Sequence, residues 1–162
     1  MKHLVIYDGN CNLCTTLVQQ LEQWDDGSEF CYVPMQDNQT LAQYNITEQD
    51  CEKGMIVIDL DTEEQWQGAD AAEKIGLLLP FSRPLIKLYQ SIPGLKLFGD
   101  TAYSHIRDNR YNWFGKTNST YWSDLKLSDN FKKERELSTE EQLVMKEMEN
   151  CDGECLQKAE IN

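Results

Sequence analysis

An apolar stretch that leads directly into a pair of cysteines is the feature that most restricts the fold of this sequence. Residues 3–7, HLVIY, are largely apolar and β-branched without alternation, which predicts a short buried strand. The next residues, DGNCNLC, place Cys11 and Cys14 where apolar residues begin to recur at helical spacing. A CxxC motif at such a strand-to-helix turn indicates thiol–disulfide chemistry more often than packing alone.

The start of a helix suits this chemistry because its unpaired N–H groups and its dipole stabilise a thiolate. We therefore expect Cys11, at the first turn, to be the nucleophile. Cys14 follows one turn later on the same face, so it can attack a mixed disulfide at Cys11 and release the product. Asp8 fits two roles, either accepting the proton of Cys14 or only tightening the turn. Its charge would raise the pKa of a neighbouring thiol.

The rest of the chain predicts a small mixed sheet covered by helices. Further strands are expected at residues 30–33, 55–58 and 65–67, the last two as a hairpin. A helix is expected from about 69 to 79, and residues 80–109 predict more helices, interrupted by proline and glycine. This order of elements is that of a thioredoxin-like α/β core with extra C-terminal helices.

The apolar periodicity fades toward the end of the chain. We expect residues 1–117 to form a thioredoxin-like domain with a helical extension, and residues 118–162 to form an acidic tail with one helix. The net charge of −13 argues against nucleic acid as a partner, because the phosphate backbone demands a basic surface. Charges and prolines interrupt residues 75–98 too often for a membrane-spanning helix. The N-terminal apolar run is too short for a signal peptide, so we expect a cytoplasmic protein.

The stretch YDGNCNLC at residues 7–14 resembles the signature of the DCC-type thiol–disulfide oxidoreductases, which is D-G-x-C-x-x-C. The resemblance covers roughly residues 3 to 115. It continues through four further stretches in the expected order: YVPMQ (32–36), MIVID (55–59), WQGADAAEKI (66–75) and NRYNWFG (109–115).

This resemblance implies a thioredoxin-like fold and dithiol–disulfide exchange with a protein or small-molecule substrate and an electron donor that the sequence does not name. The family motif matches Asp8, Cys11 and Cys14. Thioredoxins proper carry a cis-proline just before the third core strand, but residues 52–55 read EKGM. The groove beside the cysteine pair therefore lacks the usual proline, which leaves the mode of substrate binding open.

Four other cysteines bear on rival hypotheses. Cys31 lies in an apolar strand and is expected to be a small core residue, whereas Cys51 is expected to be a loop thiol without a role. Cys151 and Cys155 follow the last expected helix. Their position fits an acidic tail in which the two thiols have no function. It also fits a pair that exchanges disulfides with Cys11 and Cys14 or helps to bind a soft metal.

Two alternatives to an oxidoreductase follow. One is a zinc- or copper-binding protein that uses Cys11, Cys14 and the tail cysteines as ligands. The other is a non-catalytic interaction domain built on a redox fold. No GxGxxG or P-loop pattern is present, so we expect no organic cofactor. The direction of exchange depends on the relative stability of the oxidised and reduced forms and cannot be read from sequence.

Overall fold

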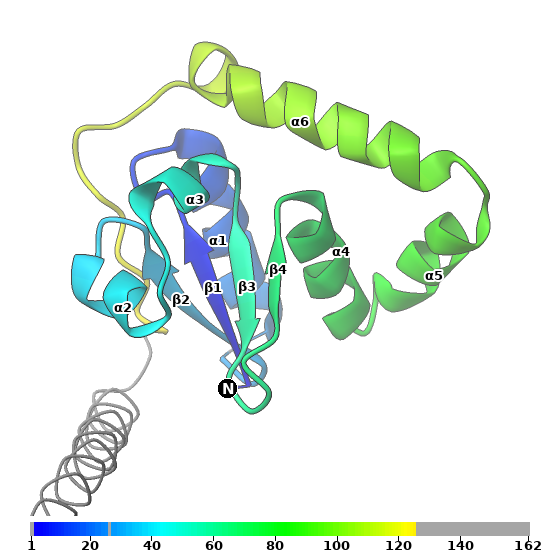
Figure 1. The fold of residues 1–162 in the computed structure, drawn as a ribbon, viewed down its shortest axis with the longest axis horizontal. Coiled ribbons are helices and arrows are strands. Elements are labelled where there is room, and N and C mark those ends of the chain that lie inside the picture. Colours follow the sequence, from blue (N-terminus) through cyan, green and yellow to red (C-terminus); the bar gives the residue numbers. More distant parts are fainter. Residues whose placement is uncertain (1, 26, 126–162) are drawn as a thin grey trace, which may run out of the picture. The chain divides into compact units, whose positions relative to one another are not determined.

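The computed structural model describes residues 2–25 and 27–125, all within a compact unit that spans residues 1–127. A four-stranded sheet in the order β2-β1-β3-β4 forms its centre (Figure 1). β1 pairs with β2 in parallel and with β3 antiparallel, and β3 pairs antiparallel with β4. The strands are β1 (His3–Tyr7), β2 (Phe30–Pro34), β3 (Ile56–Asp59) and β4 (Gln65–Gln67). This mixed sheet confirms the predicted thioredoxin-like α/β fold.

Six helices accompany the sheet in the described part of the chain. They are α1 (Asn12–Asp25), α2 (Asn38–Gln43), α3 (Glu48–Glu52), α4 (Ala69–Leu78), α5 (Arg83–Ser91) and α6 (Leu95–Phe114). The long helix α6 runs across the end of the sheet at which β1 leads into α1 (Figure 1). In residues 2–25 and 27–125 no helix is both long and apolar enough to cross a lipid bilayer.

The core lies between one face of the sheet and the helices α1 and α4. Side chains alternate between the two faces of each strand, so every second strand residue points toward these helices. The cluster consists of Val5, Tyr7, Phe30, Tyr32 and Val57 from the strands, Val18 and Leu21 from α1, and Ala71, Ile75 and Leu79 from α4 and its end. The intervening strand residues Leu4, Ile6 and Ile58 are equally buried on the opposite face, which α2 and α3 cover (Figure 1).

The chain after α6 returns to the core. The Tyr7 hydroxyl donates to the backbone carbonyl of Tyr121 at 2.9 Å. The backbone N–H of Tyr32 donates to the carbonyl of Leu125 at 3.0 Å. Residues 118–125 therefore contact both β1 and β2. The predicted end of the domain before this segment stays a prediction, which truncation can test.

Candidate functional site

The turn between β1 and α1 is shaped by close packing. Cys11 stands at the helix start, because its carbonyl accepts the first helical hydrogen bond, from the Thr15 N–H at 2.9 Å. A Cβ atom at Gly9 would lie 2.7 Å from the Thr120 side chain and 2.9 Å from Pro34. Glycine is therefore required here by the neighbouring chain segments, in addition to any need of the turn itself.

Both cysteines of the motif are free thiols at this turn. The Cys14 thiol donates a hydrogen bond to the Cys11 sulfur, and this bond is the main cause that lowers the pKa of Cys11 to about 6. Burial and the charge of Asp8 oppose it, whereas the backbone N–H groups of Cys14 and Leu13 add to it. The same hydrogen bond, together with burial, raises the pKa of Cys14 far above its usual range.

The two thiols differ in access. Cys11 has an exposed fraction of 0%, whereas Cys14 is only partly buried. The chain that covers Cys11 comprises residues 114–117, which we call the cover segment. An isolated β-bridge joins Cys11 to Lys116, and the Asn12 side chain donates to the Phe114 carbonyl at 3.0 Å. The residue expected to be the nucleophile is therefore buried, and Cys14 is the more exposed of the two thiols.

Asp8 lies beside the pair and is 5% exposed. Its Oδ1 accepts the backbone N–H of Asn10 at 3.0 Å and the side-chain amide of Gln36 at 3.2 Å. Its Oδ2 accepts the hydroxyl of Tyr111 and lies 3.5 Å from Nη2 of Arg110. The carboxylate therefore links the cysteine turn to the segment after β2 and to α6, and its charge raises the pKa of both cysteines.

Sequence reasoning did not assign Arg110 to the site, and it interpreted Tyr111 as a packing residue. Arg110 is 7% exposed, its Nη2 donates to the Tyr111 hydroxyl at 3.0 Å, and its charge lowers the pKa of Cys14 against the larger opposing effects. Both residues belong to the stretch NRYNWFG, whose basic and aromatic character was visible. Only the position of α6 across the turn shows that this stretch faces Asp8 and Cys14.

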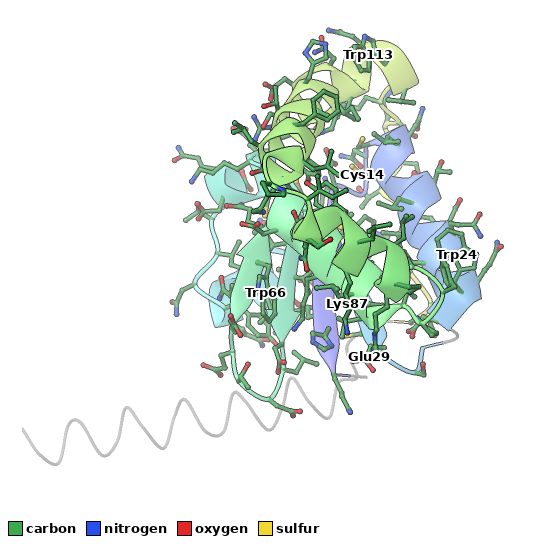
Figure 2. All side chains as sticks on the ribbon, turned by 90° about the vertical axis from the view of Figure 1, so that its right-hand side faces the viewer. Cys14, Trp24, Glu29, Trp66, Lys87 and Trp113 are labelled. Atoms are coloured by element: carbon green, nitrogen blue, oxygen red, sulfur yellow. The ribbon has the colours of Figure 1, made fainter. Side chains whose placement is uncertain are left out.

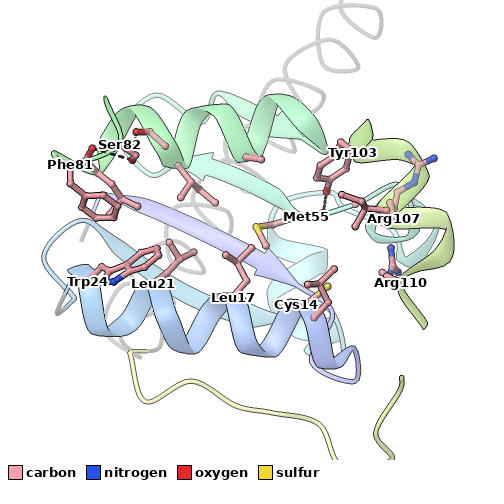
Figure 3. A pocket seen from close by; sticks show the side chains of 17 residues that line it. Cys14, Leu17, Leu21, Trp24, Met55, Phe81, Ser82, Tyr103, Arg107 and Arg110 are labelled. Atoms are coloured by element: carbon pink, nitrogen blue, oxygen red, sulfur yellow. Dashed lines mark hydrogen bonds between the residues drawn. The ribbon is translucent and has the colours of Figure 1, made fainter. Parts of the chain in front are cut away.

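A cleft of about 400 Å³ opens beside Cys14 (Figure 3). One wall is α1, the opposite wall is α4, and α6 lies at the Cys14 end. Gly54 and Met55 line the cleft at the position where thioredoxins carry the cis-proline. No peptide bond is cis in the part of the chain that the structure describes. In place of the proline, the side chain of Met55 points into the cleft near Cys14 (Figure 3).

Comparison with known proteins places this site in a family. Residues 5–116 match the model of the family described as DCC1-like thiol-disulfide oxidoreductase. The chain belongs to this family. It is 26% identical over 115 residues to a Bacillus subtilis (strain 168) protein named "Uncharacterized protein YuxK", an overlap of 71% of this chain and 82% of that one. No solved structure matches the chain.

The structure describes two of the four other cysteines of this DCC1-like chain. Cys31 is buried, as expected, and burial raises the pKa of its thiol to about 12. Cys51 was predicted to be a loop thiol, which is wrong: it lies in α3 and is buried, and burial raises its pKa to about 11. Cys151 and Cys155 lie outside the described residues, as does the metal site proposed to include them.

Within the described ranges, 2–25 and 27–125, no three side chains of histidine, cysteine, aspartate or glutamate are grouped as a metal site would require.

Proposed function

We propose that this DCC1-like protein exchanges disulfides through Cys11 and Cys14. The observation that carries the proposal is the placement of two free thiols, Cys11 and Cys14, in the first turn of α1, where Cys14 is the main cause of a lowered Cys11 pKa. Membership of an oxidoreductase family supports redox chemistry in general. The protonation states support the assignment of Cys11 as nucleophile and Cys14 as resolving thiol.

Reduction of a substrate disulfide would take two steps. The Cys11 thiolate attacks one substrate sulfur, the substrate S–S bond breaks, and the leaving sulfur takes up a proton. Cys14 then loses its proton and attacks the Cys11 sulfur, so that the mixed disulfide breaks and the second substrate sulfur leaves as a thiol. The substrate gains two electrons, Cys11 and Cys14 become a disulfide, and an external dithiol must return two electrons. The reverse steps oxidise a dithiol substrate.

Asp8 is the candidate proton acceptor for Cys14 in the second step. Its location beside the pair supports this role, and its hydrogen bonds to Gln36 and Tyr111 support the alternative role of fixing the turn. A reducing compartment such as the cytosol fits a protein that works with free thiols, and we propose that location.

Mixing the reduced full-length protein with a small peptide disulfide tests the proposal. In a chain that carries Cys151→Ser and Cys155→Ser, mass spectrometry should show a Cys11–Cys14 disulfide as the product. Adding Cys14→Ser should stop the reaction at a mixed disulfide on Cys11. Cys51→Ser serves as the control and should behave like the parent chain. A mixed disulfide on any other cysteine, or none at all, would contradict the assignment.

A further inference from the structure

The cleft beside Cys14 is apolar along most of its length. Leu17, Leu21 and Trp24 line it from α1, and Ile75 and Leu79 line it from α4 and its end. Cys14 and Trp24 lie toward the two ends of α1 (Figure 2), about 15 Å apart at the helical rise of 1.5 Å per residue. The cleft is therefore long enough for an extended apolar chain, and its volume of about 400 Å³ is in the range of small-molecule sites.

The end far from Cys14 exposes large apolar side chains. Trp24 is 50% exposed and Phe81 is 57% exposed, and their rings meet edge to face with centroids 5.0 Å apart (Figure 3). Leu17, between Trp24 and Cys14, is also exposed. Contiguous apolar surface of this kind marks a binding site more often than chance, because leaving it in water is unfavourable.

The Cys14 end of the cleft is polar. Arg110 lines it and is more than nine-tenths buried, yet its Nε has no hydrogen-bond partner among the described residues. Asp8 and Tyr111 contact the Nη2 atom of Arg110 and not Nε, which is itself buried. Arg107 lies next to Arg110 in the same wall (Figure 3). A buried guanidinium N–H without a partner favours an anionic acceptor, which forms the stronger, charge-assisted hydrogen bond.

We propose that the cleft binds an anionic amphiphile whose apolar chain lies along α1 and whose charged group contacts Arg110. This inference rests on the proposed function, because the substrate's reacting sulfur would then lie next to its anionic group at the Cys14 end of the cleft, where the Cys11 thiolate of the same helical turn would attack it. The substrate class is a small thiol or disulfide with a carboxylate, or a similar anion, near the sulfur and an apolar chain extending to Trp24. The electrons pass between this sulfur and the cysteine pair as in the two steps above.

Binding can be measured without any redox step. Dodecanoate, which has no sulfur, should bind the full-length reduced protein in calorimetry below its micellar concentration, and at least about tenfold more tightly than dodecanol, which has the same chain without charge. Leu17→Glu, at an exposed cleft position, should abolish binding. Leu85→Glu, at an exposed position of α5 outside the cleft, should leave binding unchanged. Equal binding of dodecanol and dodecanoate, or loss with both substitutions, would overturn the inference.

Arg110 requires its own variants because it also contacts Asp8. Arg110→Gln should remove the preference for dodecanoate over dodecanol while leaving dodecanol binding unchanged. If Arg110→Gln fails to fold, Arg107→Gln is the second variant and should reduce the preference by at least about threefold. A preference that survives in a folded Arg110→Gln chain would overturn the assignment of the anionic group.

A pair of substrates separates this inference from the proposed function. The disulfide of 2-mercaptododecanoate should be reduced with a kcat/KM at least about tenfold higher than that of 2-mercaptopropanoate, which has the same charged group and lacks the chain. Equal rates, with no binding of dodecanoate, would overturn the cleft inference and leave disulfide exchange intact. Binding of dodecanoate without reduction of either disulfide would support the cleft and count against the exchange.

Discussion

The pKa of the Cys11 thiol is set by neighbours that act in opposite directions. The Cys14 thiol lowers it by a hydrogen bond, whereas burial and the Asp8 carboxylate raise it, and the result is about 6. The alkylation rate of Cys11 should therefore rise through pH 6 and level off by pH 8, because the thiolate is the reacting form. Site-resolved mass spectrometry after iodoacetamide treatment measures this. Cys14→Ala, which removes the donor, should move the midpoint upward, and a midpoint near 9.0 in the parent chain, the ordinary thiol value, would contradict the hydrogen bond's role.

The same shift makes the stability of the reduced protein depend on pH. A thiol whose pKa is lower in the folded chain than in the unfolded chain contributes stability that is fully present above the unfolded pKa and is lost as the pH falls through the folded pKa. Stability from Cys11 is therefore absent below pH 6 and increases from pH 6 toward 9. Cys14 acts in the opposite sense above pH 9, since its raised pKa keeps it protonated in the folded chain.

Replacing Asp8 should change the Cys11 pKa, the rate of mixed-disulfide release and the stability of the fold, and each of these can be measured separately. Asp8→Asn removes a charge that raises the pKa of Cys11, so the alkylation midpoint should fall. If Asp8 accepts the proton of Cys14, release of the mixed disulfide should slow by about 10²-fold or more in stopped-flow measurements.

The Asp8→Asn substitution also leaves Arg110 buried without its ion pair, which should lower the free energy of unfolding in urea by about 3 kcal/mol. Asp61→Asn, at an exposed site, is the control. An unchanged release rate would leave Asp8 a structural residue.

At the scale of elements, we expect the cover segment to control access to Cys11. The side chain of Asn12 holds this segment through its hydrogen bond to the Phe114 carbonyl. Asn12→Ala should raise the plateau rate of Cys11 alkylation about fivefold, if that bond contributes about 1 kcal/mol, and should leave the pH midpoint unchanged. Thr16→Ala, at an exposed position of α1, should change neither quantity. A shifted midpoint would show that Asn12 acts on the thiol's pKa and not on its access.

The elements near the N-terminus could be predicted from sequence because their signals are local. Apolar runs marked β1, β2 and β3, and helical periodicity marked α1 and α4. The site could be predicted only as far as the residues of its own turn, Asp8, Cys11 and Cys14. The contact of Asn12 with Phe114 joins residues 102 positions apart, and that of Asp8 with Tyr111 joins residues 103 apart. No periodicity carries such information, since it depends on the path of α6 across the sheet.

The short helix α3 shows a different reason for failure. Its five residues, Glu48–Glu52, are almost all polar, so no apolar periodicity predicts a helix there. A capping box formed by Thr47 and Asp50 begins the helix, and Cys51 alone is buried. The burial of Cys51 follows from tertiary packing, which a polar sequence context conceals.

At the scale of the whole molecule, the chain beyond α6 is part of how the sheet and α1 are held together. Tyr121 accepts a hydrogen bond from the Tyr7 hydroxyl and donates from its own hydroxyl to Glu22 of α1 at 2.8 Å. Ser123 in the same segment is fully buried. These contacts join β1 to α1 from outside the sheet, although they lie beyond α6.

Two truncations test how far the cooperative unit extends. A chain ending at residue 127 should unfold at the same urea concentration as the full-length protein, because the compact unit spans residues 1–127. A chain ending at 117 should still fold but be less stable by about 1–3 kcal/mol, because the Tyr7 hydroxyl loses its acceptor. Tyr121→Phe in the longer chain removes only the bond to Glu22 and should account for a minor part of that loss. Equal stability of the two truncated chains would show that the residues after 117 do not stabilise the core, and would support a domain that ends at 117.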